Sequence, residues 1–147
     1  MAEKKKQKVF VNGPISSGFI AESIAKHTTK TSIGGHSIFL GQVRQDEKEG
    51  KTVMAIDYTC YEELAEQKLY EIREAAFAKY DLVCMHIYHS LGEVKSGEVC
   101  LFVFVSSVHR AACFDACRDI VEQIKKEVPI WGKEIFADES QSWKVNK

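Results

Sequence analysis

Residues 99–129 read VCLFVFVSSVHRAACFDACRDIVEQIKKEVP, and this stretch decides the fold. Its first part is an uninterrupted run of apolar, mostly β-branched and aromatic residues, which predicts a strand over 99–105. The part after the two serines has apolar residues at spacings of three and four, typical of one face of an α-helix: Phe114, Cys117, Val121 and Ile124. We predict a helix over about 108–127, capped by Ser106 or Ser107 and ended by Pro129.

The same patterns can be followed outward in both directions. A second helix is predicted over 61–80, where one stripe again has helical spacing: Tyr61, Ala65, Leu69, Ile72, Ala76 and Tyr80. A shorter helix begins at Ser16 or Ser17 and ends near 27. Strands are predicted over 9–11, 35–44, 52–58, 82–89 and 130–136. We interpret 45–51 as a charged, exposed connection and 91–97 as a loop.

This order of elements predicts an α+β fold, in which a mixed, largely antiparallel sheet carries packed helices. A chain of 147 residues is about the size of one domain, and neither a repeat nor a linker interrupts it. We therefore expect a single domain over 1–147, in which residues 1–8 form a disordered, lysine-rich tail.

Composition excludes several classes of function. The formal net charge is -1, whereas nucleic-acid and membrane-surface binding usually need a basic excess, so neither partner is expected. The sequence has no stretch that predicts a signal peptide or a membrane span, which favours a cytoplasmic protein. The five cysteines indicate buried thiols in a reducing compartment. Cys113 and Cys117 share a helix face, but no histidine completes a metal-ligand set with them, so we favour packing.

Three groups of basic residues lie where anions commonly bind. His109 and Arg110 open the predicted helix over 108–127, and a helix N-terminus attracts anions. Arg44 ends a strand beside the charged connection, and Lys125 lies in the last turn of the same helix as His109. Each observation also has an ordinary explanation, since solvated charges are common at these positions and the helix dipole alone favours a lysine in a last turn.

Five ordered motifs together resemble the large subunits of molybdopterin synthase. They are Gly35-x-x-x-Phe39-x-Gly41-x-Val43-Arg44, Tyr58-x-x-Tyr61, His89-x-x-Gly92-Glu93-Val94-x-x-Gly97-Glu98, Ser106-x-x-His109-Arg110 and Lys125-x-x-x-Pro129-Ile130-Trp131. The resemblance covers the chain from about Val9 to Trp143. It implies an α/β hammerhead-type fold and a central homodimer.

The resemblance also implies an activity and a partner. Each large subunit of this family binds a small ubiquitin-like subunit, which makes a heterotetramer, and receives sulfur from the thiocarboxylate on that subunit's C-terminal Gly-Gly. The sulfur acceptor is cyclic pyranopterin monophosphate, which becomes molybdopterin after two transfers. The family implies no metal and no organic cofactor.

Site residues follow from the resemblance by position. Lys125 corresponds to the main catalytic lysine, and Arg44, His109 and Arg110 correspond to groups that bind the substrate phosphate. Gln42, Val43, Gly132 and Glu134 are expected to complete the substrate site. His109 and Lys125 are sixteen positions apart, which corresponds to about 24 Å of helix, so a pocket containing both must be shared between two subunits.

Gly132 occupies the position where the family usually has its second functional lysine. We expect Lys133 to act as a partial stand-in, although adjacent residues of an extended segment point to opposite faces. Gly132 at positive φ would turn Lys133 inward, whereas Gly132 at negative φ would accept a lysine that raises activity.

Two other functions are kept as alternatives. One is a non-catalytic paralogue that binds the small partner as a scaffold, an interpretation that Gly132 motivates. The other is a nucleotide- or RNA-binding domain using Arg44, His109 and Arg110, against which the neutral net charge argues.

Overall fold

The computed structural model describes residues 8–145. Three helices and eight strands follow one another in the order β1, α1, β2, β3, β4, α2, β5, β6, α3, β7, β8. The helices are α1 (Ser17–Ala25), α2 (Glu62–Lys79) and α3 (Arg110–Glu127). The strands are β1 (Phe10–Asn12), β2 (Gly35–Gln42), β3 (Glu47–Lys48), β4 (Lys51–Cys60), β5 (Cys84–Lys95), β6 (Val99–Ser107), β7 (Ile130–Phe136) and β8 (Gln141–Trp143). All but residue 8 of the tail predicted over 1–8 lies outside the described residues.

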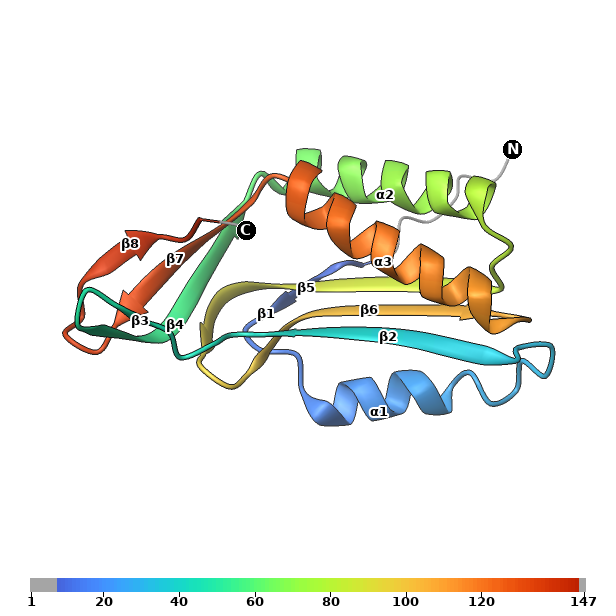
Figure 1. Ribbon diagram of the computed structural model, residues 1–147, viewed down its shortest axis with the longest axis horizontal. Helices are drawn as coiled ribbons and strands as arrows, with labels where there is room; N and C mark the ends of the chain where they lie inside the picture. The colour runs from blue at the N-terminus through green and yellow to red at the C-terminus, as the bar shows by residue number, and fades with distance from the viewer. Residues whose placement is uncertain (1–7, 146–147) are drawn as a thin grey trace.

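The strands form one sheet in the order β2-β6-β5-β4-β7-β8. Its neighbours are antiparallel except for β1, which pairs in parallel with β5 near His89. Figure 1 shows α2 and α3 on one face of the part formed by β2, β5 and β6, with α1 on the opposite face and β4, β7 and β8 extending to one side. The mixed α+β fold predicted from the sequence is confirmed.

β6 is apolar from Val99 to Val105, as expected for a strand with both faces buried. Leu101, Val103 and Val105 belong to the main core, which α2 and α3 cover. Phe102 and Phe104 face the other way and form a second cluster with Ile15 on the α1 side. The continuous apolar run at 99–105 thus specifies the central strand of a three-layer arrangement.

Two predicted segments differ from the structure. The loop predicted over 91–97 is wrong, because β5 continues to Lys95 by pairing with β4 from Tyr58↔Gly92 to Ala55↔Lys95. The burial of Val94 explains this continuation. The connection predicted over 45–51 is exposed, but it includes β3, which forms a hairpin with β4.

The apolar stripe predicted for α3 is also partly wrong. Phe114 is 57% exposed, and the face that packs on the sheet is made of Cys113, Ala116, Cys117, Ile120 and Ile124. The packing role predicted for Cys113 and Cys117 is confirmed, since both thiols are free and buried. Among the described residues, no helix is long and apolar enough to cross a membrane.

Candidate active site

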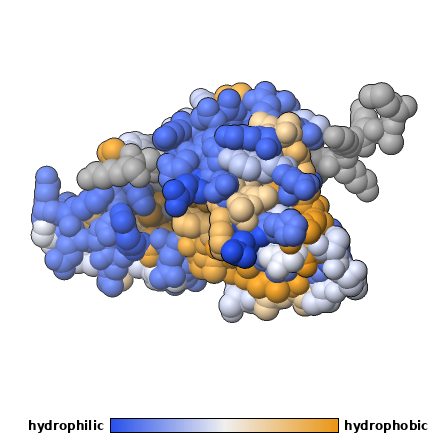
Figure 2. All heavy atoms as spheres, turned by 45° about the vertical axis from the view of Figure 1, so that its right-hand side comes forward, coloured by the Kyte–Doolittle hydropathy of each residue, from blue (hydrophilic) through white to orange (hydrophobic). Residues whose placement is uncertain are grey.

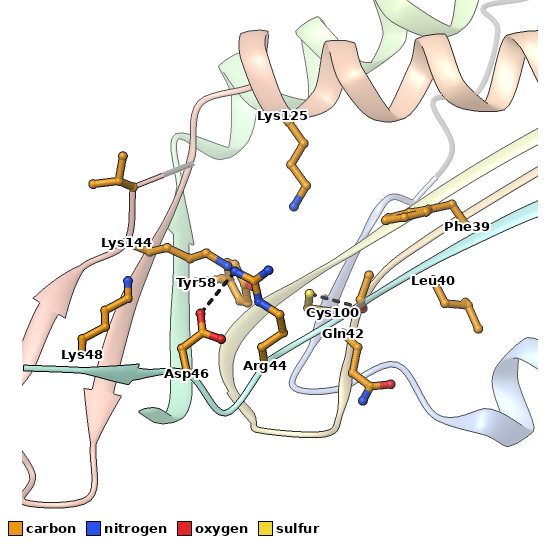
Figure 3. Close-up of a pocket in the computed structure, with 12 residues that line it drawn as sticks. Phe39, Leu40, Gln42, Arg44, Asp46, Lys48, Tyr58, Cys100, Lys125 and Lys144 are labelled. Carbon is orange, nitrogen blue, oxygen red and sulfur yellow. Dashed lines mark hydrogen bonds and ion pairs between the residues drawn. The ribbon is translucent and has the colours of Figure 1, made fainter. Parts of the chain in front are cut away.

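A basic pocket of about 370 Å³ lies where the two parts of the sheet meet below the end of α3 (Figure 3). The end of β2 and the following connection form its floor, and the last turn of α3 lies above it. Its lining combines cationic, polar and apolar side chains: Phe39, Leu40, Gln42, Arg44, Asp46, Lys48, Tyr58, Cys100, Lys125, Lys144 and Val145, with Gly41.

Lys125 enters the pocket from the last turn of α3. The helix ends two residues later, at Glu127, because Pro129 cannot continue the helical hydrogen bonds and Val128 is already extended as the C-cap. In Figure 3 the amine of Lys125 points down toward Tyr58 and Arg44. Lys125, which the family motif predicts as the catalytic lysine, therefore lies over the pocket.

Arg44 and Lys48 reach the pocket from the segment after β2, and each has an acidic partner. The guanidinium of Arg44 lies 3.2 Å from Asp46, and both side chains keep a substantial exposed fraction, so this pair leaves the guanidinium accessible. Lys48 lies 2.6 Å from Glu134, whose side chain is only 2% exposed. Glu134 therefore positions a lysine at the rim and does not line the pocket itself.

Lys144 is a pocket residue that the sequence analysis missed. It follows β8, and its backbone N–H donates to the carbonyl of Gly132 at 2.9 Å, which directs the half-buried side chain inward. Burial, with Lys125 and Arg44 as nearby cations, lowers the pKa of Lys144 below its ordinary value. Only the pairing of β8 with β7 brings this residue to the pocket, so no motif around Lys125 reveals it.

Tyr58, Cys100 and His89 form a polar wall beside the two lysines. Burial and the neighbouring Cys100 thiol raise the pKa of Tyr58 well above its usual range, so its hydroxyl stays protonated. Burial lowers the pKa of His89 to about 4, although its Nδ1 bonds the carbonyl oxygen of Ser90 at 2.7 Å. His89 and Tyr58 also line a narrow recess of about 30 Å³ that shares Lys125 and Lys144 with the main pocket.

Gly132 lines this recess, whereas Lys133 lies elsewhere. Gly132 has no positive φ, so the backbone does not turn Lys133 inward. The Lys133 amine instead lies 4.8 Å from the centre of the Trp143 ring. A Cβ added at Gly132 would approach Ile56 Cγ2 to 2.7 Å and a Tyr58 ring carbon to 3.3 Å, so the space that a lysine would need is already filled.

The remaining predicted residues are distributed over both ends of α3. Gln42 lines the pocket, while the Val43 side chain is buried beside it, 1% exposed. His109 is the N-cap of α3 and Arg110 its first residue, at the end opposite Lys125. Both are exposed and lie near the start of β2, where a Cβ on Gly35 would be 3.9 Å from Arg110 Cα. One chain therefore does not bring His109 and Arg110 to its own pocket.

Comparison with known proteins gives a consistent result. The family model described as MoaE protein matches residues 15–127. The molybdopterin synthase catalytic subunit of Pyrococcus abyssi is 40% identical over 124 residues, which cover 84% of this chain and 82% of that protein. The subunit of the same name from Aspergillus fumigatus is 36% identical over 122 residues, and the match spans 83% of this chain but only 64% of that protein.

Solved structures agree with the fold. Molybdopterin synthase from Staphylococcus aureus is similar with a TM-score of 0.82 and 30% identity, covering 97% of this chain and 99% of that one. A complex of subunits 1 and 2 of molybdopterin-converting factor from Helicobacter pylori contains a chain with a TM-score of 0.80 at 16% identity, over 95% and 90% of the two chains, which shows the shared fold. With its family-model match and its identity to the Pyrococcus subunit, this chain belongs to the MoaE protein family.

Proposed function

We propose that this chain is the catalytic subunit of a molybdopterin synthase, a cytoplasmic sulfurtransferase acting on cyclic pyranopterin monophosphate. The observation that carries the proposal is the pocket in which Arg44, Lys125 and Lys144 surround a space of about 370 Å³. Several cations around one cavity suit an anionic ligand of this size, and a guanidinium at the rim pairs well with phosphate oxygens.

Sulfur would be supplied by the C-terminal thiocarboxylate of a small ubiquitin-like subunit. Its sulfur attacks a carbon of the substrate side chain, where a carbon–sulfur bond forms while a carbon–oxygen bond breaks and the oxygen leaves as a phosphate oxygen or as water, so the tail is joined to the substrate as a thioester. Water then attacks the acyl carbon, so the tail leaves as a carboxylate and the sulfur stays on the pterin. The related H. pylori structure is a complex of two subunits, which supports a partner of this kind.

Lys125 is the proposed main catalytic group. Its amine enters the cavity from above, where it is placed to stabilise the negative charge that develops on the acyl oxygen during water attack. Tyr58 keeps its proton because of its raised pKa and is a hydrogen-bond donor on the same wall.

Lys144, rather than Lys133, is the proposed second lysine. Lys133 is held over Trp143, whereas Lys144 lines both the pocket and the recess next to Gly132. The lowered pKa of Lys144 increases its neutral fraction near neutral pH, which suits a group that accepts and returns a proton. A lysine supplied by the residue after β8 would thus compensate for the glycine at the family position.

The active unit is proposed to be a homodimer that completes the pocket with His109 and Arg110 of the second chain. β2 is the outer strand of the sheet order, and its consecutive Ile38, Phe39 and Leu40 are all more than a third exposed. Figure 2 shows hydrophobic surface in a band below the hydrophilic helices. If two β2 strands met antiparallel about a two-fold axis, each Gly35 end would approach the partner's Gln42 end.

That arrangement would bring Arg110 of one chain toward Arg44 of the other, since Arg110 lies beside Gly35 and Arg44 follows Gln42. It would also satisfy the free edge of the sheet, which otherwise exposes backbone donors and acceptors. With two small subunits the complete enzyme would be a heterotetramer.

Reconstitution tests the proposed function directly. The purified chain is incubated with a thiocarboxylated small subunit and cyclic pyranopterin monophosphate, and molybdopterin is detected as its fluorescent oxidised derivative. Formation of molybdopterin is expected. Binding of the small subunit without any product would instead identify a non-catalytic scaffold, the alternative that Gly132 motivates.

A further inference from the structure

A cluster of metal-ligating side chains lies on the α1 side of the sheet, away from the basic pocket. His27 follows the end of α1, and Cys84 and His86 are two residues apart on β5, so their side chains point to the same face. His27 and Cys84 are buried and His86 is half-buried. None of the three lines the basic pocket or its recess.

The donor atoms converge. His27 Nε2 lies 3.0 Å from His86 Nε2, and the ligand atoms of all three residues lie within 4.8 Å of one another. A tetrahedral zinc ion with Zn–N near 2.0–2.1 Å and Zn–S near 2.3 Å separates neighbouring donors by about 3.3–3.7 Å. The donor separations, from 3.0 Å to at most 4.8 Å, bracket this range, so side-chain rotations that move the donors by about an ångström would reach that geometry.

The surroundings orient the imidazole of His27 for coordination. Its Nδ1 lies 2.7 Å from the backbone carbonyl of Ser23, and a carbonyl acceptor at this distance places the proton on Nδ1 and leaves the lone pair on Nε2. The ring is also stacked on Phe104 with centroids 4.6 Å apart. Histidines that bind metals typically donate a hydrogen bond of this kind from the ring nitrogen that does not contact the metal.

The groups around Cys84 and His86 hold both side chains in the cluster. The Lys30 amine donates to Cys84 Sγ at 2.8 Å, which fixes the sulfur beside the two imidazoles. The ring of His86 is held by edge contacts with the rings of His27 and Phe104, whose centroids lie 4.9 Å and 6.1 Å away. Without metal, one imidazole would donate to the other at 3.0 Å, and the Cys84 sulfur would accept from Lys30.

We propose that His27, Cys84 and His86 bind a divalent zinc ion, with the fourth coordination position left for water or a small ligand. Two imidazoles and one thiolate provide nitrogen and sulfur donors, which suit zinc, whereas magnesium and calcium are bound by oxygen donors. The ion would tie the segment after α1 to β5 and so stabilise the packing of α1 on the sheet. This site is separate from the proposed sulfur-transfer chemistry and does not depend on it.

Cobalt binding tests the site, because a Co²⁺–thiolate bond gives a charge-transfer absorption band. The full chain is stripped of metal with a chelator and titrated with Co²⁺, and Zn²⁺ is then added in competition. An equimolar band that zinc removes is expected in the wild type. The band should be lost in Cys84→Ser, and His27→Gln should weaken zinc binding by about 100-fold or more.

Matched controls separate this site from the other thiols and histidines. Cys60→Ser changes a half-buried thiol outside the cluster, and His109→Gln changes an exposed histidine at the start of α3; both should bind Co²⁺ as the wild type does. His86→Asn provides the same test if Cys84→Ser does not fold. Absence of a thiolate band in the wild type, or its retention in Cys84→Ser, would overturn the proposal.

Discussion

At the scale of single residues, the chemistry of the pocket depends on which lysines reach it. Lys125 is found by its position before Pro129, but Lys144 and Lys133 can be separated only by the pairing of β7 with β8. That pairing sets Lys133 opposite Trp143 and leaves the next residue, Lys144, to bond Gly132 and enter the pocket. Their separation from Lys125 along the chain does not show which of Lys133 and Lys144 reaches the pocket.

Lys125→Ala should reduce molybdopterin formation by about 100-fold or more, as expected for loss of a catalytic group. Its effect on the free energy of unfolding should stay within about 0.3–1 kcal/mol, because a lysine in a last turn contributes mainly through the helix dipole. Single-turnover product formation and urea unfolding measure the two quantities. Near-normal turnover would remove Lys125 from the mechanism.

Lys144→Met should lower activity strongly, while Lys133→Met serves as its matched control and should keep most of it. The reason is geometric, since the Lys144 side chain lines the pocket and Lys133 lies over Trp143. Initial rates at saturating substrate, measured with the small subunit in excess, compare the variants. The reverse order of activities would return the role of second lysine to Lys133.

Gly132→Lys should destabilise the protein and give no gain in activity, although the backbone at Gly132 has no positive φ. The new Cβ would meet Ile56 Cγ2 at 2.7 Å, and overpacking of this kind typically costs about 1–3 kcal/mol. Urea unfolding measures the loss, and Gly18→Lys, where a Cβ would meet only Ser16 Oγ at 4.0 Å, controls for the added charge. Higher turnover in Gly132→Lys would show that the recess accommodates a lysine.

At the scale of elements, most of the fold is predictable where one face of a segment is buried. The apolar stripe of α2 predicts its buried residues Ala65, Leu69, Ile72 and Ala76, because helical spacing and burial coincide there. The end of β5 is not predictable in the same way. Gly92 and Gly97 suggest a loop, but pairing with β4 is a long-range contact that local composition does not contain.

The pocket shows the same division between local and long-range information. Arg44 and Lys125 belong to motifs, and their positions at a strand end and a helix end are local features. Lys144, Cys100 and Asp46 come together only when the sheet forms. Sequence patterns therefore indicate the anion-binding groups but do not reveal the full set of side chains around them.

The burial of His89 in β5 should make stability depend on pH. Its pKa is about 4 in the folded protein and about 6.5 in the unfolded chain, so below pH 6.5 the unfolded state binds the extra proton. The contribution of neutral His89 to the free energy of unfolding is complete above pH 6.5 and is lost as the pH falls toward 4. At pH 5 this loss amounts to roughly 2 kcal/mol. Urea unfolding at pH 8 and pH 5 should show a smaller difference for His89→Asn than for the wild type; equal differences would contradict the assignment.

At the scale of the whole molecule, the length of α3 separates Lys125 from His109 and Arg110, although the family resemblance predicts that all three bind one substrate. Lys125 contributes to the pocket, whereas His109 and Arg110 lie at the opposite helix end. The single domain predicted over 1–147 remains a prediction, but the position of these residues already requires a second chain if all of them bind one substrate. The exposed apolar β2 edge supplies a surface for that chain.

Mixing two inactive variants tests whether the pocket is shared. Arg110→Ala removes a cation that the proposed dimer supplies to the partner's pocket, and Lys125→Ala removes one from the chain's own pocket. A mixed dimer then has one pocket with both residues intact and one pocket with neither. After random exchange about half of the dimers are mixed, so roughly a quarter of wild-type activity should return. Exchange through mild denaturant and refolding, followed by the sulfur-transfer assay, measures the recovery.

Equal mixing of Lys125→Ala with Lys144→Met is the control, because both residues belong to the same pocket of one chain and each mixed dimer keeps both pockets defective. Recovery in the control but not in the test pair, or a monomer by sedimentation at micromolar concentration, would contradict the shared site.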